Sequence, residues 1–323
     1  MKKYLKHIIV ALVSFLFIVF LNFFLPRLLP GDTIGYLTGI DEANMSTEKY
    51  NYYYHALHLD ENIFVQFGYY LKSLFDGTLG YSYRKEMNVS TLIGERILPT
   101  LLICIPALII SYLISITLGI KSGLKENSIL DKSMSITSII LNSIPGFVIT
   151  LIIIIVFSLN SKLFPNNGLV SGEYSPTSFY YYLDLIYHLV LPVLCLVLIL
   201  TPARFLLIRN LSSSIKDSKT ISFATQRGLS TATIEYKYVL PNIISPIITN
   251  IGLSIGIIFG STIIIENIFS INGIGKLLNE AIYNLDYPLM QGLLFVTSLV
   301  MTLAVIISDI LCILINPKIR KKV

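Results

Sequence analysis

The stretch LVLPVLCLVLILTPARFLLI, residues 189–208, decides the fold class of this chain. Only one of its residues, Arg204, is charged. A helix needs about 20 mostly apolar residues to cross the hydrocarbon core of a bilayer, and this stretch meets that length. Five more stretches have the same character: 8–25, 97–120, 134–159, 243–265 and 289–315. The sequence therefore predicts an all-α, polytopic membrane protein with six transmembrane helices.

The composition excludes an ordinary soluble protein of this length. Of the 323 residues, 54% are hydrophobic and only 13% are charged, whereas soluble domains carry about 25% charged residues. The first apolar run follows Lys2, Lys3 and Lys6 and is longer than the roughly 7–15 apolar residues of a signal peptide. We therefore expect residues 8–25 to form a retained membrane anchor.

The distribution of charge predicts the orientation of the six helices. If the amino terminus is cytoplasmic, the inner segments hold 16 basic and 4 acidic residues: 1–7, 121–132, 201–242 and 316–323. The outer segments then hold 7 basic and 13 acidic residues: 28–96, 159–188 and 267–287. Basic residues favour the cytoplasmic side of a membrane. Both termini are therefore expected to be cytoplasmic, and the net charge of +5 calls for no nucleic-acid partner.

Two long segments are expected on the outer side. Residues 28–96 are rich in tyrosine and acids and contain the turn signals Pro30-Gly31 and Asp76-Gly77, which indicate a small folded cap. His55 and His58 lie three residues apart in this cap, and a hydrogen-bonded or exposed pair is a better interpretation of them than a metal site. Residues 159–188 form a second outer loop with several tyrosines near the membrane interface.

The longest inner loop lies between the fourth and fifth predicted helices. Residues 219–227 are expected to form a short helix that ends at Gly228, because glycine adopts the left-handed conformation at little cost. Ser230 or Thr231 can cap a second helix that runs towards Pro241. An exposed Phe223 suits docking into a groove of another protein. An amphipathic loop on the membrane surface explains the same pattern, so the residues alone leave both readings open.

Several residues inside the predicted spans are expected to shape helix packing. Gly252, Gly256 and Gly260 follow at four-residue steps, so they share a helix face and permit close packing inside this chain, packing against a partner, or lining of a pathway. Pro145 is expected to kink the third span. Arg204 and Arg209 are expected to extend their side chains to the inner interface. Asp309 is expected to pair with a basic residue there. Three cysteines are expected to be packing residues: Cys104, Cys195 and Cys312.

The inner loop resembles the coupling motif of permeases of binding-protein-dependent ABC importers. That pattern reads Glu-Ala-Ala, three residues, Gly, nine residues, then Ile-x-Leu-Pro. Four residues stand at matching offsets: Ala224, Gly228, Leu240 and Pro241. Three depart from the pattern: Ser222, Phe223 and Tyr238. Absence of the glutamate is common in the dipeptide/oligopeptide/nickel (DppB/OppB-like) branch of the family.

Other stretches resemble the same branch in order along the chain. They are 29–32 (LPGD), 143–147 (SIPGF), 266–275 (ENIFSINGIG), 286–292 (DYPLMQG) and 316–320 (NPKIR). The resemblance thus runs nearly end to end. It implies a type I ABC importer permease core, called MetI-like, over 97–323, with the coupling loop at 211–242. Residues 1–96 would supply the anchor helix and the extracytoplasmic cap.

The resemblance implies a transport subunit, the pore-forming permease of an ATP-driven importer in the cytoplasmic (inner) cell membrane. The expected cargo is peptides, with nickel or another metal chelate as the alternative. Expected partners are a second homologous permease, two cytoplasmic ABC ATPases and an extracytoplasmic solute-binding protein. ATP and Mg would be bound by the ATPases, because Gly275-Lys276 is followed by Leu277 where a phosphate-binding loop needs Ser or Thr. No catalytic or metal site and no cofactor are expected in this chain.

The resemblance also implies roles for individual residues. Contact with an ATPase is expected of five of them: Phe223, Ala224, Gln226, Arg227 and Leu229. Phe223 would act as an apolar plug, Arg227 would pair with an acid of the partner, and Gly228 would allow the turn. A membrane enzyme is disfavoured because the spans carry no cluster of nucleophiles, histidines or acids. A homo-oligomeric channel or membrane scaffold stays as a more remote alternative.

Overall fold

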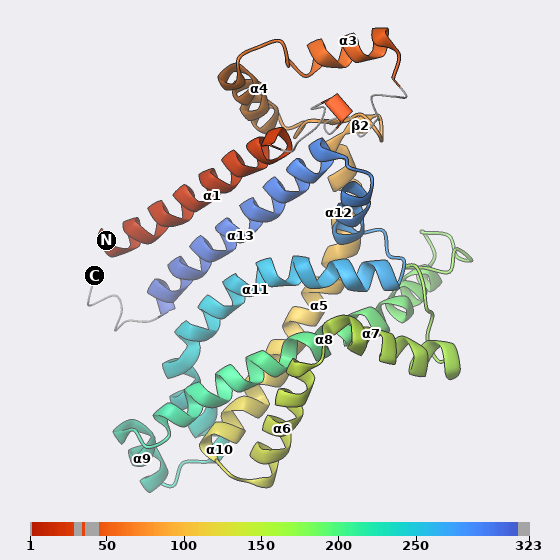
Figure 1. Ribbon diagram of the computed structural model, residues 1–323. Helices are drawn as coiled ribbons and strands as arrows, with labels where there is room; N and C mark the ends of the chain where they lie inside the picture. The colour runs from red at the N-terminus through yellow and green to blue at the C-terminus, as the bar shows by residue number, and fades with distance from the viewer. Residues whose placement is uncertain (1, 29–33, 36–44, 316–323) are drawn as a thin grey trace. The chain divides into compact units, whose positions relative to one another are not determined.

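In the computed structural model of the chain, residues 2–28, 34–35 and 45–315 are described (Figure 1). They form two compact units, one of residues 1–100 with 272–306 and one of 101–271 with 307–323. The motif stretches 29–32 and 316–320 lie outside the described residues, as does the carboxyl-terminal basic cluster. The division of the chain at residue 96 stays a prediction.

The first unit is built from helices and one short hairpin. Its elements are α1 (Lys2–Leu28), α3 (Thr47–Ala56), α4 (Ile63–Phe75), β1 (Tyr81–Ser82), β2 (Met87–Asn88), the start of α5 (Val89–Leu124), α12 (Ile274–Tyr283) and most of α13 (Tyr287–Ile315). Ser46 and Asn62 begin α3 and α4, because each side chain accepts a hydrogen bond from a backbone N–H of the first turn. Strand β1 pairs antiparallel with β2. The unit thus contains a small folded segment, α3 to β2, between α1 and α5 in the chain.

Buried polar contacts hold this unit together. Gln291 on α13 donates a hydrogen bond of 2.7 Å to the backbone oxygen of Asn22 on α1. The hydroxyl of Ser82 in the hairpin donates to the carboxylate of Asp286, which also accepts from the backbone N–H of Leu289 at 3.2 Å. Burial raises the pKa of Asp286. The motif stretch that begins at Asp286 therefore fastens the hairpin to the start of α13.

The second unit holds the remaining helices around two apolar clusters. Its elements are the rest of α5, α6 (Ile129–Ser143), α7 (Gly146–Ile154), the π-helix η2 (Ile155–Asn160), α8 (Phe179–Ile215), α9 (Lys219–Gln226), α10 (Thr231–Thr233), the π-helix η3 (Ile234–Val239) and α11 (Leu240–Ile268). One cluster joins α5, α7, α8 and α11, and the other joins α5, α8, α9, η3 and the start of α11. The second cluster is the one that positions the inner loop.

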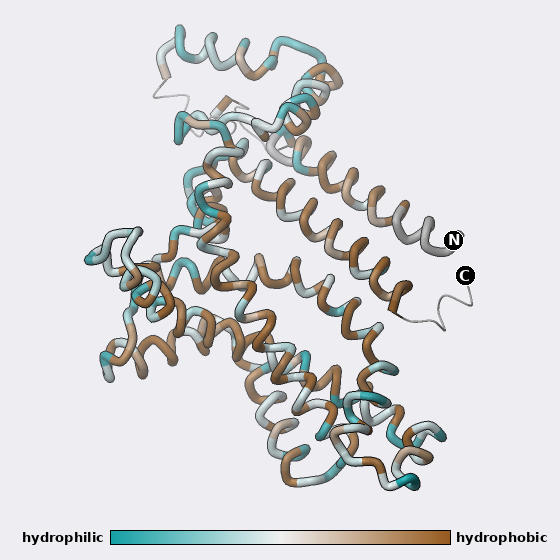
Figure 2. Tube along the Cα trace, turned by 180° about the vertical axis from the view of Figure 1, so that it is seen from behind, coloured by the Kyte–Doolittle hydropathy of each residue, from teal (hydrophilic) through white to brown (hydrophobic). Residues whose placement is uncertain are grey.

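Four helical stretches among the described residues are long and apolar enough to cross a membrane: Val89–Leu124, Phe179–Ile215, Thr231–Ile268 and Tyr287–Ile315. Figure 2 shows hydrophobic residues along most of their length. α6 with α7 and η2 makes a fifth if the bent pair counts as one span. In α1 the described apolar part, Ile9–Phe24, is shorter. The count of six helices therefore stays a prediction.

The third predicted span departs from the expected kinked helix. α6 and α7 meet at a bend of 100°, which is a break in the helix. Ile144 is extended, with φ −89° and ψ 128°, and Pro145 stands immediately before α7. Proline disfavours the helical conformation of the residue before it and has no N–H of its own to donate. Pro145 therefore ends one helix and begins the next, where a kink within one helix was expected.

Candidate functional site

The inner loop forms the short helix and turn that its sequence predicts. Ile221 and Ala224 are the buried residues of α9 and pack into the second apolar cluster. Gly228 has φ +68°, the left-handed conformation that glycine favours, and its N–H donates to the Thr225 oxygen at 2.9 Å. Ser230 then caps α10 by accepting from the N–H of Thr233 at 3.4 Å. The predicted helix, its end at Gly228 and the serine cap are confirmed.

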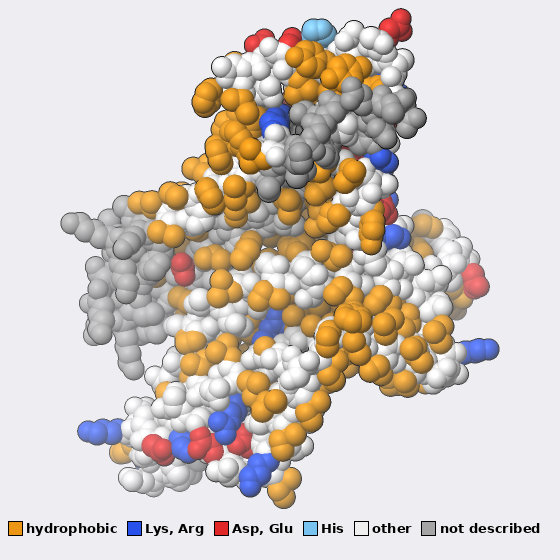
Figure 3. All heavy atoms as spheres, in the orientation of Figure 1, with side chains coloured by type: hydrophobic (Ala, Val, Ile, Leu, Met, Phe, Trp, Pro, Cys, Tyr) orange, Lys and Arg blue, Asp and Glu red, His pale blue; other side chains and the backbone are white. Residues whose placement is uncertain are grey.

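One face of α9 remains open. Phe223 is 59% exposed, and the guanidinium of Arg227 lies 5.6 Å from the centre of its ring. Gln226 is exposed beside them, and Leu229 is half-buried against the second cluster. Figure 3 shows charged side chains gathered on the part of the second unit that carries α9. This face combines an aromatic ring, an amide and a positive charge, which suits contact with an acidic, partly apolar protein groove.

Ala224 occupies a different position from its neighbours. Its side chain is fully enclosed by this chain, so it supports α9 from within and offers no surface to a partner. Sequence reasoning grouped it with the exposed residues because it stands in the motif. The buried residues of α9 recur at a spacing of three, and Phe223, about 100° around the helix from Ala224, falls outside that buried face.

The loop continues without a break into a predicted span. Helical structure runs from Thr231 to Ile268, with a wider π-helical turn at η3. At that turn the N–H of Leu240 donates to the Glu235 oxygen, one residue further back than in an α-helix. Pro241, which has no N–H to donate, is exposed directly after this wider turn, and Leu240 packs half-buried against the second cluster. The part after Gly228 is therefore joined rigidly to α11.

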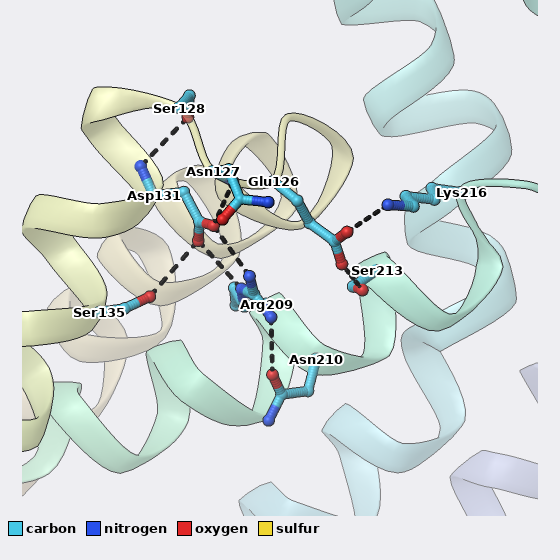
Figure 4. A network of polar contacts seen from close by, with 9 residues as sticks. All are labelled: Glu126, Asn127, Ser128, Asp131, Ser135, Arg209, Asn210, Ser213 and Lys216. Atoms are coloured by element: carbon cyan, nitrogen blue, oxygen red, sulfur yellow. Dashed lines mark hydrogen bonds and ion pairs between the residues drawn. The ribbon is translucent and has the colours of Figure 1, made fainter.

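A polar network joins the turn after α5, the start of α6 and the end of α8 (Figure 4). Arg209 on α8 donates two hydrogen bonds, of 2.9 and 2.8 Å, to the two carboxylate oxygens of Asp131 on α6. Asp131 is 3% exposed and also accepts from the backbone N–H of Asn127 at 3.0 Å. A bidentate arginine–carboxylate pair fixes orientation as well as distance. It therefore ties the start of α6 to the end of α8.

A second ion pair in the same network joins the turn after α5 to the segment before α9. Glu126 accepts hydrogen bonds from Lys216 and from the hydroxyl of Ser213. The bond from Lys216, followed by that from Ser213, holds the pKa of Glu126 below its usual value. The same contact raises the pKa of Lys216. Both groups are thus charged at neutral pH, and the network has two ionised pairs.

Sequence reasoning missed this network. The partners in its two ion pairs are 78 and 90 residues apart, and no local pattern specifies such pairs. A weak signal was present, since Glu126 and Asp131 are two of the four acids on the predicted inner side. Arg209 was expected at the inner interface without a partner.

Close helix packing occurs at two glycines of α5 that the sequence analysis did not single out. A Cβ at Gly123 on α5 would lie 2.4 Å from the backbone oxygen of Arg209 on α8, and one at Gly119 would lie 3.0 Å from Ile208. Of the predicted glycines, Gly252 is buried and Gly256 is half-buried. Gly260 is exposed, with open space around its Cβ position. Within the described chain, α5 and α8 therefore approach through Gly119 and Gly123, a pair with the four-residue spacing that sequence reasoning assigned to α11.

Arg204 is placed differently from its prediction. It is 4% exposed and does not extend to an interface. Its guanidinium lies 4.5 Å from the ring centre of Tyr112 and donates to the Ser111 hydroxyl at 2.6 Å. The Tyr112 hydroxyl donates to Asn250 on α11 at 2.7 Å. The positive charge of Arg204 therefore lies in a polar cluster among α5, α8 and α11. The sequence had predicted that this side chain would extend to water.

The remaining predicted residues lie apart from this site. Asp309 is partly exposed, and none of the ion pairs of the described residues includes it. His55 bonds to Asp60 at 3.1 Å, and His58 stacks on the ring of Tyr69 at 3.7 Å. The two histidines thus have separate partners. The three cysteines are buried and free.

Comparison with known proteins identifies the family. Residues 115–321 match the family described as binding-protein-dependent transport system inner membrane component. A protein named as a peptide permease in Brucella suis is 32% identical over 325 residues, covering 99% of each chain. The nickel import system permease protein NikB of Staphylococcus aureus is 28% identical over 320 residues, covering 98% of this chain and 92% of its own. This chain belongs to the family of binding-protein-dependent transport system inner membrane components, the permease subunits of ABC importers.

Proposed function

We propose that this chain forms half of the pore of an ATP-driven peptide importer in the cytoplasmic membrane. The relative named as a peptide permease matches along the whole length, which supports peptides as cargo. The nickel import permease matches nearly as far, so nickel or another metal chelate is the second candidate. The other half of the pore would come from a second permease, and an extracytoplasmic binding protein would deliver the cargo.

The proposed topology has six spans with both termini in the cytoplasm and residues 28–96 as an outer cap. The sorting of charge in the sequence supports it, with 16 of the 24 basic residues in the proposed inner segments. α1 and the bent α6–α7 pair would supply the two spans beyond the four long apolar helices.

The observation that carries the coupling proposal is the geometry of α9. Two buried residues fix the helix to this chain, while Phe223, Gln226 and Arg227 remain open for a partner. In the proposed importer this face docks into a groove of a cytoplasmic ABC ATPase. ATP and Mg are bound by that partner, and its closure moves α9, which is joined to α8 and α11. The spans then alternate between inward- and outward-facing states as rigid elements.

A pull-down of the assembled importer tests the docking face. Phe223→Asp is expected to abolish co-purification of the ATPase, because a charge replaces the apolar plug, while membrane insertion stays normal. Thr225→Asp is the matched control, since it adds the same charge at an exposed position on a different side of the same helix and is expected to retain the ATPase. Equal recovery of ATPase with both variants would rule out Phe223 as the docking residue.

Uptake by the reconstituted importer tests the cargo. Proteoliposomes that hold the permease pair and ATPases, supplied with the binding protein, are expected to accumulate a labelled dipeptide only when ATP is present. Accumulation of a nickel–histidine chelate in place of the dipeptide would select the second candidate. Failure of both, with the ATPases bound and active, would overturn the peptide and nickel assignments together.

A further inference from the structure

Helix α4 in the first unit has two different faces. Phe67 and Tyr70 pack against α1, with the Phe67 ring 5.0 Å and the Tyr70 ring 5.5 Å from that of Phe23. The face that carries Phe64, Gly68, Leu71 and Phe75 follows the helical repeat over three turns. Phe64 is 78% exposed and Phe75 is 88% exposed. α4 therefore presents an apolar stripe that is exposed at both ends and half-buried at Leu71, and Figure 3 shows hydrophobic side chains over this part of the molecule.

A cavity of about 340 Å³ lies beside α4 within the same unit. Arg27 of α1, Tyr70 and Lys72 of α4, and Pro288 and Gln291 of α13 are among its lining residues. The Tyr70 hydroxyl is buried and has no hydrogen-bond partner in the described structure. A buried hydroxyl without a partner is unfavourable, so this group is suited to bind an acceptor that enters the cavity.

The guanidinium of Arg27 lies over the Phe23 ring, 3.8 Å from its centre, and its hydrogen bonds go to neutral groups. Its Nε donates to Gln66 at 3.0 Å and its Nη1 to the Phe23 oxygen at 3.0 Å, and both acceptors are neutral. No carboxylate of the described residues forms an ion pair with it. Asp76 is the acid among the lining residues, and its carboxylate already accepts two hydrogen bonds from Thr78. The cavity thus has two basic side chains and a free hydroxyl for an anion.

The position of the cavity identifies the kind of anion. Arg27 follows the apolar stretch of α1, Ile9–Phe24, by three residues, and Pro288 and Gln291 stand in the first turns of α13. Lipid headgroups lie at the ends of apolar helices, and aromatic side chains are enriched there. An amphipathic helix with an exposed apolar stripe lies in the same zone of a membrane.

We propose that this cavity binds the phosphate of a phospholipid headgroup from the outer leaflet, with the exposed stripe of α4 in contact with the lipid around it. Arg27 and Lys72 supply positive charge, and Tyr70 donates a hydrogen bond to a phosphate oxygen. The proposal goes beyond the transport function and rests on the outer placement of residues 28–96. It gives the outer cap a fixed depth at the membrane surface.

Native mass spectrometry of the assembled importer titrated with phosphatidylglycerol tests the cavity. The wild type is expected to retain one lipid that Arg27→Gln binds about tenfold more weakly, the change that 1.4 kcal/mol produces. Tyr70→Phe keeps the shape of the side chain and is expected to weaken retention as well. Lys49→Gln removes a charge from the exposed surface of α3 and is the matched control. The proposal would be overturned if Arg27→Gln and Tyr70→Phe retained as much lipid as Lys49→Gln.

Competition separates a lipid from a free oxyanion. Inorganic phosphate at the concentration of the lipid is expected to leave retention unchanged, because it lacks contact with the α4 stripe. Full displacement by inorganic phosphate would show that the cavity binds free phosphate and would refute the lipid assignment. Co-purification of the ATPase, measured on the same variants, is expected to stay normal, so failure of this proposal is distinguishable from failure of the transport function.

Fluorescence tests the stripe of α4, because the chain has no tryptophan. Phe64→Trp, reconstituted in nanodiscs with brominated lipid, is expected to be quenched at least about twofold more than Tyr52→Trp. Tyr52 is 66% exposed on the polar helix α3 of the same unit and serves as the control. The tryptophan fluorescence of the partner subunits is measured on the complex without the introduced tryptophan and is subtracted. Equal quenching of the two reporters would show that protein or water covers α4 and would exclude lipid contact.

Discussion

Replacing Gly123 by alanine tests the contact between α5 and α8 that supports the inner loop. The added Cβ would lie 2.4 Å from the backbone oxygen of Arg209, 2.6 Å from the Cβ of Ser212 and 2.9 Å from the backbone nitrogen of Ser213. Ordinary contacts begin at 3.4 Å, so the helices must separate locally by about 1.0 Å. Two of the three atoms are backbone and have no side-chain rotation that relieves the clash.

The magnitude follows from two opposing terms. Overpacking of a tight interior costs about 1–3 kcal/mol, and backbone clashes belong at the upper end. Alanine in place of glycine within a helix returns about 0.5–1 kcal/mol. The net loss for Gly123→Ala is therefore about 2 kcal/mol, which corresponds to a fall in Tm of roughly 4–8 °C. Gly260→Ala makes the same change with no atom within 4 Å of the new Cβ, so only the favourable term remains.

The buried cysteines provide the assay. Cys104, Cys195 and Cys312 are free and buried, so a fluorogenic maleimide reacts with them only as the protein unfolds on heating. Gly119→Ala is expected to fall between the other two variants, because its nearest neighbour is the side chain of Ile208 at 3.0 Å. The reasoning is refuted if Gly123→Ala melts at or above the temperature of Gly260→Ala.

Three further predictions concern the same melting temperature, which is followed by far-ultraviolet circular dichroism where the pH is varied, because maleimide reacts only with the thiolate form of cysteine. The Glu126–Lys216 pair is fully effective between about pH 4.5 and 10.5, because it is lost only as pH falls through the lowered pKa of Glu126 or rises through the raised pKa of Lys216. Between pH 7 and 3 the Tm of the wild type is therefore expected to fall more than that of Glu126→Gln, and parallel curves would contradict this. Asp131→Asn is expected to cost about 3 kcal/mol, the lower end for a broken buried pair because Arg209 is partly exposed. Arg209→Lys keeps the charge and is expected to cost about 1 kcal/mol for the lost second bond; equal losses would argue against a bidentate pair. Tyr112→Phe is expected to cost about 1–2 kcal/mol by removing the hydrogen bond to Asn250, and an unchanged Tm would show that water replaces it.

The turn after α9 was predictable because its signals are local. A glycine at a helix end and a serine two residues later specify a left-handed residue and a cap wherever they occur together. The long apolar helices were predictable for a similar reason, since length and composition alone decide whether a helix can cross a bilayer. Both features depend on neighbours in the sequence.

The rest depends on neighbours in space. Pro145 signalled an interruption, but the 100° bend follows from how α6 and α7 pack on α8, which the sequence does not state. Arg204 at the end of an apolar run has the pattern of an arginine at an interface. Its buried position follows from the Ser111 hydroxyl and the Tyr112 ring on another helix, 93 residues away. The glycine spacing on α11 was equally visible, but the close approach at Gly119 and Gly123 of α5 depends on where α8 lies in space.

The connections of α9 decide where a force on it would act in the proposed importer. After Gly228, helical structure runs unbroken from Thr231 through α11, so this side is rigid. Before α9, Lys216 is paired with Glu126 and Arg209 with Asp131, so the end of α8 is tied to the turn after α5 and to α6. Because both sides are fixed, α9 has little freedom to move alone. A displacement of its exposed face would be transmitted to α5, α6, α8 and α11 together, as rigid-body motion of the second unit requires.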